Sequence, residues 1–232
     1  MKQASSALLA VKRYALITGA SQGFGRCLAI ELARLHIPTI LVSLPGENIQ
    51  QVAAACRSYG ADSCYYETDL SIRENVIDFT AWVKARYTVY LLINNAGRGG
   101  SSSFVDTDPN YLENVIDLNI LATVLITHQL LPMLMLQPQA YVLNVSSMAS
   151  FCPIGYKTVY PATKRFVQHF SRGLYQELKD THVFVSVVHP GPMKTNRNVT
   201  SRIEHQGFFG KIGLLSPELA AKITIRKLLK KD

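Results

Sequence analysis

Short apolar segments alternate with longer segments of helical periodicity along almost the whole chain, and this alternation limits the fold more than any other feature. The short segments lack a polar residue at every second position, which is typical of strands buried on both faces of a parallel sheet. They predict strands at residues 14–18, 39–43, 63–67, 89–93, 140–145 and 183–188. The segments between and after them predict helices at residues 24–36, 47–59, 72–86, 110–136, 156–179 and 217–230.

This alternation predicts an α/β fold, a doubly wound parallel sheet of six or seven strands with helices on both faces. A loop is expected over residues 189–216, and the last helix should begin with Ser216 as its N-cap and Pro217 in its first turn. Pro132 marks a position at which the helix 110–136 is expected to bend. The chain has 232 residues, 48% of them hydrophobic, with no linker or repeat, so we interpret residues 1–232 as a single domain.

The formal net charge is +8, from 24 Lys and Arg against 16 Asp and Glu. Basic residues are scattered except in the last helix, which holds Lys222, Arg226, Lys227, Lys230 and Lys231. We interpret it as a surface helix with an apolar side and expect no membrane contact. We also expect no nucleic-acid binding, because the chain has no helix-turn-helix, zinc-finger or aromatic RNA-binding pattern.

Two further patterns concern the compartment of the protein. The most apolar long segment, 118–136, contains His128, Gln129 and Pro132 and predicts a buried helix rather than a membrane span. The four cysteines show no CxxC pair and no metal-ligand spacing: Cys27, Cys56, Cys64 and Cys152. We therefore expect free thiols, no metal site and a cytoplasmic protein.

A glycine-rich segment, Thr-Gly-Ala-Ser-Gln-Gly-Phe-Gly at residues 18–25, lies between the first predicted strand and the first helix. Glycines allow a tight turn, and backbone N–H groups at the helix N-terminus can then bind a diphosphate. The spacing Gly-x-x-x-Gly-x-Gly differs from the more common Gly-x-Gly-x-x-Gly, and glycine turns also occur without a ligand. The position between strand and helix favours a dinucleotide-binding loop.

Asn94-Asn95-Ala96-Gly97 follows the fourth predicted strand. In a doubly wound sheet, ligands bind beyond the carboxyl ends of the strands, near the point where the strand order reverses. The tetrapeptide is therefore expected beside the same ligand, although by itself it is equally an ordinary turn.

Tyr160 and Lys164 are four residues apart in a predicted helix, so their side chains share one face. A nearby ammonium group favours the phenolate, and we expect it to lower the pKa of Tyr160 towards neutrality, as general acid–base catalysis requires. Ser147 follows the fifth strand, and its hydroxyl is expected to bond a substrate oxygen.

Together the three motifs resemble those of the short-chain dehydrogenase/reductase family, over residues 14–230 and in the order of that family. The resemblance implies a Rossmann-type sheet and an NAD(P)-dependent oxidoreductase acting on a small-molecule carbonyl or alcohol. Tyr160 would exchange a proton with the substrate, Lys164 would hold the nicotinamide ribose, and Ser147 would orient the substrate oxygen. Asn119, in Asp-Leu-Asn-Ile at 117–120, would anchor a proton-relay water.

The resemblance also implies a set of cofactor contacts, to which Tyr160 and Lys164 would contribute. The phosphate loop would comprise Gly19, Ser21, Gln22, Gly23, Phe24 and Gly25. Contacts to the adenine and along the rest of the cofactor would come from Ser43, Asp69, Leu70, Asn95, Ala96, Gly97, Pro190, Gly191 and Thr195. Asp69 alone is equally explained as a solvated acid in a turn.

Three features depart from the pattern of the family. Phe24 stands where isoleucine is usual, which should change packing only. The second strand ends at Ser43 rather than at an acid that would repel a 2′-phosphate, which favours NADP over NAD, although neither Leu44 nor Gln22 supplies a base. A seventh strand has no counterpart before Asp232, so we expect either a longer natural chain or the loss of this edge strand.

The substrate is expected to be an apolar ketone or alcohol, ketoacyl- or steroid-like, because apolar side chains are candidates to line the site: Phe151, Cys152, Ile154, Met193, Phe208, Phe209 and Ile212. Core packing explains several of them equally well. A nucleotide-bound regulator without turnover remains an alternative, as does, more remotely, a membrane- or nucleic-acid-associated protein. The helices 110–136 and 156–179 carry more apolar surface than one sheet face covers, and we expect a homodimer or homotetramer formed through them.

Overall fold

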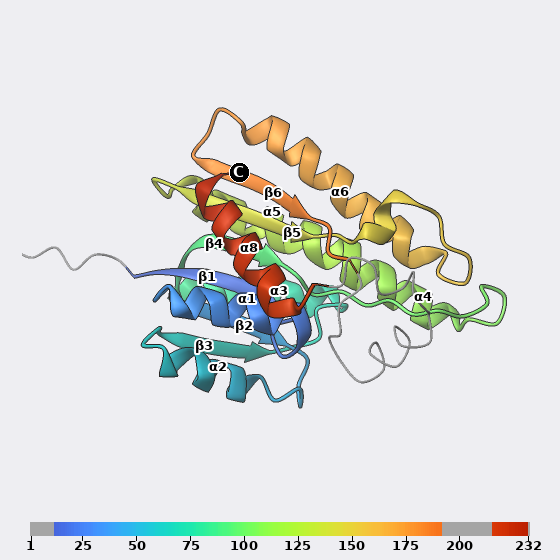
Figure 1. Ribbon diagram of the computed structural model, residues 1–232, viewed down its shortest axis with the longest axis horizontal. Helices are drawn as coiled ribbons and strands as arrows, with labels where there is room; N and C mark the ends of the chain where they lie inside the picture. The colour runs from blue at the N-terminus through green and yellow to red at the C-terminus, as the bar shows by residue number, and fades with distance from the viewer. Residues whose placement is uncertain (1–11, 192–214, 232) are drawn as a thin grey trace, which may run out of the picture.

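Six parallel strands form one sheet in the order β3-β2-β1-β4-β5-β6 (Figure 1). The computed structural model describes residues 12–191 and 215–231. The strands are β1 (Arg13–Thr18), β2 (Thr39–Ser43), β3 (Ser63–Glu67), β4 (Thr88–Asn94), β5 (Ala140–Val145) and β6 (Val183–Val188). All six lie where the sequence predicts them, and the order reverses between β1 and β4.

Helices cover both faces of the sheet, as the sequence predicts (Figure 1). One face packs against α1 (Gly23–Arg34), α2 (Ile49–Ser58) and α8 (Pro217–Lys230). The other packs against α3 (Arg73–Arg86), α5 (Ala122–Met135) and α6 (Val159–Leu178). The strands supply side chains to both cores in alternation, for example Ile17 to the first and Leu16 to the second. Burial on both faces explains why these strands read as continuous apolar runs.

The long helix predicted at 110–136 is interrupted, but not at Pro132, which lies inside α5. It consists of α4 (Pro109–Ile116), a π-helical segment at Asp117–Leu121 and then α5. π-Helical turns are rare and occur often at functional sites. The predicted site residue Asn119 lies within this segment.

The segment Pro109–Met135 is the stretch of the described chain whose length and apolar composition would allow it to cross a membrane. One of its faces packs on the sheet through Ile126, Leu130 and Leu134. Ile116 and Met135 of the same segment are exposed. The predicted buried helix is therefore buried on one side, and 39% of its most apolar window lies inside the molecule.

Several helix ends differ from the prediction because residues there adopt left-handed backbone angles. Tyr156, expected to begin the helix before Lys179, has a φ of 60°, and α6 begins three residues later, at Val159. Asn48 has a φ of 55°, so α2 begins after it rather than at residue 47. The last helix is as predicted, since the Ser216 hydroxyl accepts a hydrogen bond from the Leu219 N–H at 3.2 Å.

Candidate active site

The carboxyl ends of β1 and β4 lie side by side at the point where the strand order reverses, and both are followed by predicted site loops. Asn95 joins the two loops. Its side-chain amide donates hydrogen bonds to the carbonyl oxygens of Thr18 and Gly19, both at 2.9 Å. The Thr18 hydroxyl in turn accepts from the backbone N–H groups of Asn95 and Ala96, both at 3.0 Å. The glycine loop and the Asn-Asn-Ala-Gly segment therefore form one structure.

The glycine loop has a shape that fits a diphosphate. Gly19 and Gly23 have φ values of 64° and 56°, which disfavour other residues. A Cβ atom on Gly25 would collide with the Gly19 carbonyl and the Asn95 amide. The N-cap of α1, Gln22, makes no side-chain capping bond, and the first turn holds no acid. The N–H groups of this turn therefore remain available for an anion.

Two of the predicted cofactor contacts, Phe24 and Leu70, can be made only by backbone atoms. The side chains of Phe24 and Leu70 are buried in the two cores, so the departure at Phe24 affects packing, as expected. Asp69 accepts hydrogen bonds from the Ser71 N–H at 2.9 Å and the Ser71 hydroxyl at 2.6 Å. Its carboxylate is thus fixed in a turn. Ser21, within the glycine loop itself, is half-buried.

Two acids near the end of β2 escaped the sequence analysis. Ser43 is buried and donates its hydroxyl to the Leu44 carbonyl at 3.0 Å. Glu47 accepts a hydrogen bond from the Gln22 side chain at 3.3 Å, and Glu67 accepts one from the Gly46 N–H at 3.2 Å. Both carboxylates therefore flank the segment after β2. Glu47 follows Ser43 by only four residues, whereas Glu67 follows Ser43 by twenty-four and is brought there by the pairing of β3 with β2.

Tyr160 and Lys164 lie on the first two turns of α6 and face the same site. Lys164 is 5% exposed, and its ammonium group donates a hydrogen bond to the Val145 carbonyl at the end of β5, at 2.9 Å. A Cβ atom on Gly97 would lie 2.9 Å from Lys164 Nζ. The sheet end and the loop after β4 thus enclose this ammonium group.

Burial, rather than mutual attraction, dominates the acid–base properties of this pair. Burial lowers the pKa of Lys164 to about 8. Burial also raises the pKa of Tyr160 above its ordinary value, while a hydrogen bond with Ser147 acts in the opposite direction. The expected depression of the Tyr160 pKa is therefore wrong for this structure, because desolvation disfavours the phenolate more than its surroundings favour it.

Ser147 and Ser146 have different surroundings. Ser146 is buried and donates its hydroxyl to the Lys164 carbonyl at 2.8 Å, which joins β5 to α6. Ser147 is the N-cap of a short 3-10 helix (Met148–Phe151), and its hydroxyl oxygen accepts a bond from the Ala149 N–H at 3.2 Å. Its proton remains available for Tyr160 or for a substrate oxygen.

Asn119 is fully buried, and its side-chain amide is fully engaged. Its Oδ1 accepts from the Arg98 N–H at 2.8 Å, while Nδ2 donates to the Arg98 carbonyl and to the Thr163 hydroxyl, both at 2.9 Å. The Asn119 carbonyl accepts from the Thr123 hydroxyl at 3.1 Å. Asn119 thus holds the loop after Gly97 against α6.

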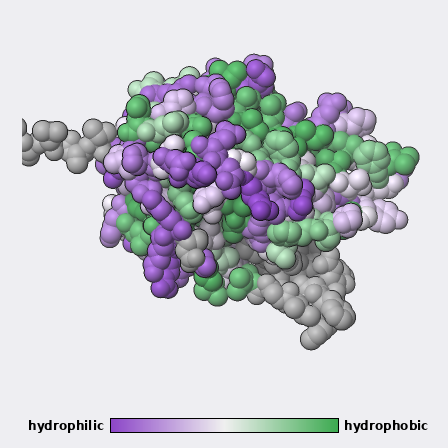
Figure 2. Space-filling model, turned by 90° about the horizontal axis from the view of Figure 1, so that it is seen from above, coloured by the Kyte–Doolittle hydropathy of each residue, from purple (hydrophilic) through white to green (hydrophobic). Residues whose placement is uncertain are grey.

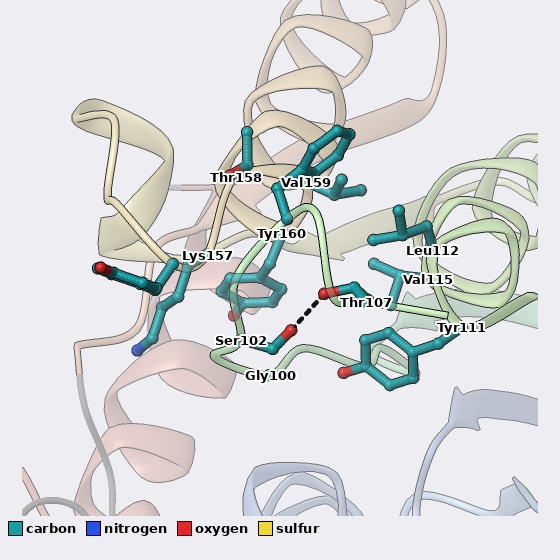
Figure 3. Close-up of a pocket in the computed structure, with 12 residues that line it drawn as sticks. Gly100, Ser102, Thr107, Tyr111, Leu112, Val115, Lys157, Thr158, Val159 and Tyr160 are labelled. Carbon is teal, nitrogen blue, oxygen red and sulfur yellow. Dashed lines mark hydrogen bonds between the residues drawn. The ribbon is translucent and has the colours of Figure 1, made fainter. Parts of the chain in front are cut away.

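A small pocket opens beside Tyr160 (Figure 3). It lies between the loop after β4, helix α4 and the start of α6. Figure 3 shows the Tyr160 and Tyr111 rings on either side of Gly100 and Ser102. Other lining residues are Phe104, Thr107, Leu112, Val115, Tyr156, Lys157, Thr158 and Val159. The lining residues between Gly100 and Val115 were not predicted, although the run Gly-Arg-Gly-Gly at 97–100 was a signal for a close-packed loop.

The remaining predicted residues lie at the edge of this site or outside the described chain. Pro190 and Gly191 follow β6, and the Pro190 carbonyl accepts from the Met148 N–H at 3.0 Å. Phe151 and Cys152 are exposed, and Ile154 is half-buried. Five predicted residues lie outside the described residues, together with most of the predicted loop 189–216: Met193, Thr195, Phe208, Phe209 and Ile212. Among the described residues, no cluster of metal-ligand side chains is found.

Comparisons with known proteins agree with this arrangement. A family model described as short chain dehydrogenase matches residues 13–206. The chain is 30% identical over 194 residues to the very-long-chain 3-oxoacyl-CoA reductase of Anas platyrhynchos, which covers 82% of this chain and 62% of that protein. It is 31% identical over 164 residues to estradiol 17-beta-dehydrogenase 11 of Mus musculus, over 70% of this chain and 55% of that protein.

The fold is also found among solved structures. The short-chain dehydrogenase from Sphingobium yanoikuyae in complex with NADPH superposes with a TM-score of 0.84 at 24% identity. The match covers 95% of this chain and 85% of that one. The chain therefore spans most of a solved dehydrogenase but less than two thirds of each of the two relatives above.

Proposed function

The chain belongs to the short-chain dehydrogenase/reductase family, and we propose that it interconverts an apolar ketone and its alcohol with NADP as the hydride carrier. One observation carries this proposal: the Tyr160 and Ser147 hydroxyls and the Lys164 ammonium group meet at the carboxyl end of the sheet, beside a glycine loop that fits a diphosphate. Ligands of doubly wound sheets bind at this position.

Each residue has a distinct task. Ser147 donates a hydrogen bond to the substrate oxygen and orients the carbonyl. Tyr160, protonated because burial raises its pKa, donates a proton to that oxygen during reduction and accepts it back during oxidation. Lys164, fixed by the Val145 carbonyl, holds the nicotinamide ribose and places a positive charge beside the phenolate that forms. The bound nicotinamide supplies or accepts the hydride.

The choice of NADP rests on the end of β2. Ser43 offers no carboxylate to a 2′-phosphate there. Glu47 and Glu67 act in the opposite direction, although Glu47 is exposed to solvent and bonded to Gln22, and Glu67 is bonded to the Gly46 N–H. Solvent screening weakens an exposed charge, so we expect NADPH to bind more tightly than NADH.

The choice of an apolar substrate rests on the surface near the site. Figure 2 shows apolar side chains at the end of the molecule towards which the strands point, and others in the opposite half. Exposed apolar residues near the pocket are Phe104, Val105, Met148, Phe151 and Tyr156. Val105 is 90% and Tyr156 72% exposed, an arrangement that a large apolar ligand would cover. A 3-oxoacyl-CoA reductase and an estradiol dehydrogenase among the relatives support the same substrate class.

We place the protein in the cytoplasm, as a homodimer or homotetramer. The described cysteines are free thiols, which suits a reducing compartment. Phe166 is 40% exposed and stacks on Phe170, with ring centroids 6.1 Å apart, and α4 leaves Ile116 exposed. One turn further along α6, Leu174 is buried against the sheet, and Phe170 packs partly against the same core. Phe166 and Phe170 remain the candidate contact between two α6 helices.

The proposal is tested with Tyr160→Phe and a panel of ketones and alcohols. The variant should keep the fold and the dinucleotide affinity, because the substitution removes one hydroxyl. Turnover should fall about 10²–10⁴-fold, the usual contribution of general acid–base catalysis. Nicotinamide absorbance with NADPH and NADH measures turnover, and fluorescence titration measures affinity. Turnover of the variant within about threefold of the wild type would remove Tyr160 from the mechanism.

A further inference from the structure

A closed circuit of contacts surrounds Tyr160 and involves two residues with no role so far, Thr163 and Gly99. The Thr163 hydroxyl donates to the Tyr160 carbonyl at 2.8 Å and accepts from Asn119 Nδ2 at 2.9 Å. Asn119 in turn bonds both the N–H and the carbonyl of Arg98. The circuit closes at Gly99, which lies against the Tyr160 ring.

Gly99 leaves no room for a side chain between the loop and the Tyr160 ring. A Cβ atom there would lie 2.8 Å from Cγ and 2.9 Å from Cε2 of the Tyr160 ring. Such contacts are closer than side-chain carbons tolerate, so the ring would have to move. Gly99 therefore allows the loop to serve as one wall for the ring.

The hydrogen bonds of the Thr163 hydroxyl to the Tyr160 carbonyl and to Asn119 are also difficult to replace. Thr163 is 2% exposed, and Asn119 is fully buried, so neither can replace a lost partner with bulk water. Removing the Thr163 hydroxyl would leave one N–H of the Asn119 amide without an acceptor, which is costly in a buried site. Asn119 would have to shift. Because it is hydrogen-bonded to the backbone of Arg98, the adjoining Gly99 would move as well.

We propose that Thr163 and Gly99 are positioning residues that together fix the Tyr160 ring between α6 and the loop after β4. Thr163 ties the backbone of Tyr160 to Asn119, and Asn119 ties the loop so that Gly99 meets the ring. This inference rests on the proposed function for its kinetic consequence, since the ring is positioned for proton transfer. Its structural consequence, the fixed environment of the ring, does not require a substrate.

The test compares Thr163→Val, Thr163→Ser and Gly99→Ala with the wild type. A displacement of about 1 Å can cost about 100-fold in rate, so Thr163→Val and Gly99→Ala should lower kcat about 10–100-fold. KM and dinucleotide affinity should change less than about threefold, because both variants leave the glycine loop untouched. Thr163→Ser keeps the hydroxyl and should restore kcat to within about threefold of the wild type.

Thr80→Val is the matched control. Thr80 is also a buried threonine in a helix and donates its hydroxyl to the carbonyl three residues earlier, that of Ile77, at 3.0 Å. It belongs to α3 and has no bond to Asn119. A loss of kcat in Thr80→Val equal to that in Thr163→Val would mean that the loss reflects general destabilisation.

A second readout needs no turnover. Tyrosine labelled with 13C at Cζ gives one signal per ring, and the Tyr160 signal is the one missing from Tyr160→Phe. Its position and its titration with pH should change in Thr163→Val and Gly99→Ala, but not in Thr163→Ser or Thr80→Val. An unchanged Tyr160 signal in both variants, or a Thr163→Ser variant as impaired as Thr163→Val, would overturn the inference. If the wild type reduces no carbonyl, the proposed function fails, and this signal alone decides the positioning role.

Discussion

Lys164 should destabilise the folded chain at neutral pH, and its replacement by methionine should reveal by how much. The side chain is 5% exposed, and Val145 O accepts its hydrogen bond. The ion pairs within residues 12–191 and 215–231 involve Lys12 and Arg34, so no described carboxylate neutralises Lys164. A buried ammonium group without a counter-ion has lost hydration that nothing replaces. Methionine keeps the length of the side chain and removes the charge.

The magnitude follows from the pKa. The ordinary lysine pKa of 10.5 falls to about 8 in the folded chain, a difference worth roughly 3 kcal/mol of unfolding free energy. Below about pH 8 both folded and unfolded chains bind the proton, and the full penalty is present. Between about pH 8 and 10.5 the unfolded chain binds more protons than the folded one, so the stability of the wild type rises with pH. The penalty therefore shrinks by about 1.4 kcal/mol per pH unit in this window.

The assay is urea unfolding of both proteins at several pH values, with the difference in unfolding free energy as the observable. Lys164→Met should be the more stable protein near neutral pH, and its advantage should decline above about pH 8. Lys222→Met, on the exposed side of α8, is the matched control, because an exposed ammonium group keeps its hydration on folding. A difference that stays constant between about pH 8 and 9.5 would refute the reasoning, because Lys164 would then titrate alike in both states.

Three further outcomes are expected. Ser43→Asp should shift preference from NADPH to NADH about 10-fold or more in fluorescence titrations, because the carboxylate would repel a 2′-phosphate; unchanged preference would contradict our choice of NADP. Gly25→Ala should weaken dinucleotide binding, because its Cβ would collide with Gly19, whereas Gly173→Ala meets nothing within 4 Å and should leave binding intact in the same titration. Phe166→Glu should yield monomers in sedimentation experiments, and a wild type that is already monomeric at about micromolar concentration would contradict the proposed assembly.

The sequence predicted most of the fold because the strands are buried on both faces. Strands of this kind read as continuous apolar runs, and β2 and β5, which are buried along their whole length, were located to the residue. The edge strands β3 and β6 are only partly buried, but the predicted bounds match them as well. Helix ends were less predictable. Tyr156 and Asn48 adopt positive φ. Asparagine tolerates this region better than most residues, but a tyrosine gives no such signal in the sequence. The π-helical turn at Asp117–Leu121 was not predicted either, and the hydrogen bond of its Asn119 to Thr163, 44 residues away, has no local signal in the sequence.

The candidate site divides in the same way. Gly19, Gly25 and Asn95 could be found in the sequence because their roles depend on backbone conformation and close approach, which only certain residue types permit. Two other contacts could not be found in the sequence. Glu47 and Gln22 are 25 residues apart, and Thr163 and Asn119 are 44 residues apart. The hydrogen bond from Thr163 to the Tyr160 carbonyl depends on the side-chain rotamer of Thr163.

The direction of the pKa shifts was also beyond the sequence, and it changes the interpretation of the site. A spacing of four residues predicts that Lys164 and Tyr160 are near each other but says nothing about how much water surrounds them. In the structure, burial favours the neutral form of both groups, lowering the pKa of Lys164 and raising that of Tyr160. Tyr160 therefore holds its proton at neutral pH and is prepared to act as an acid. A site with this property suits carbonyl reduction, in which the phenol gives its proton to the developing alkoxide and Lys164 stabilises the phenolate left behind.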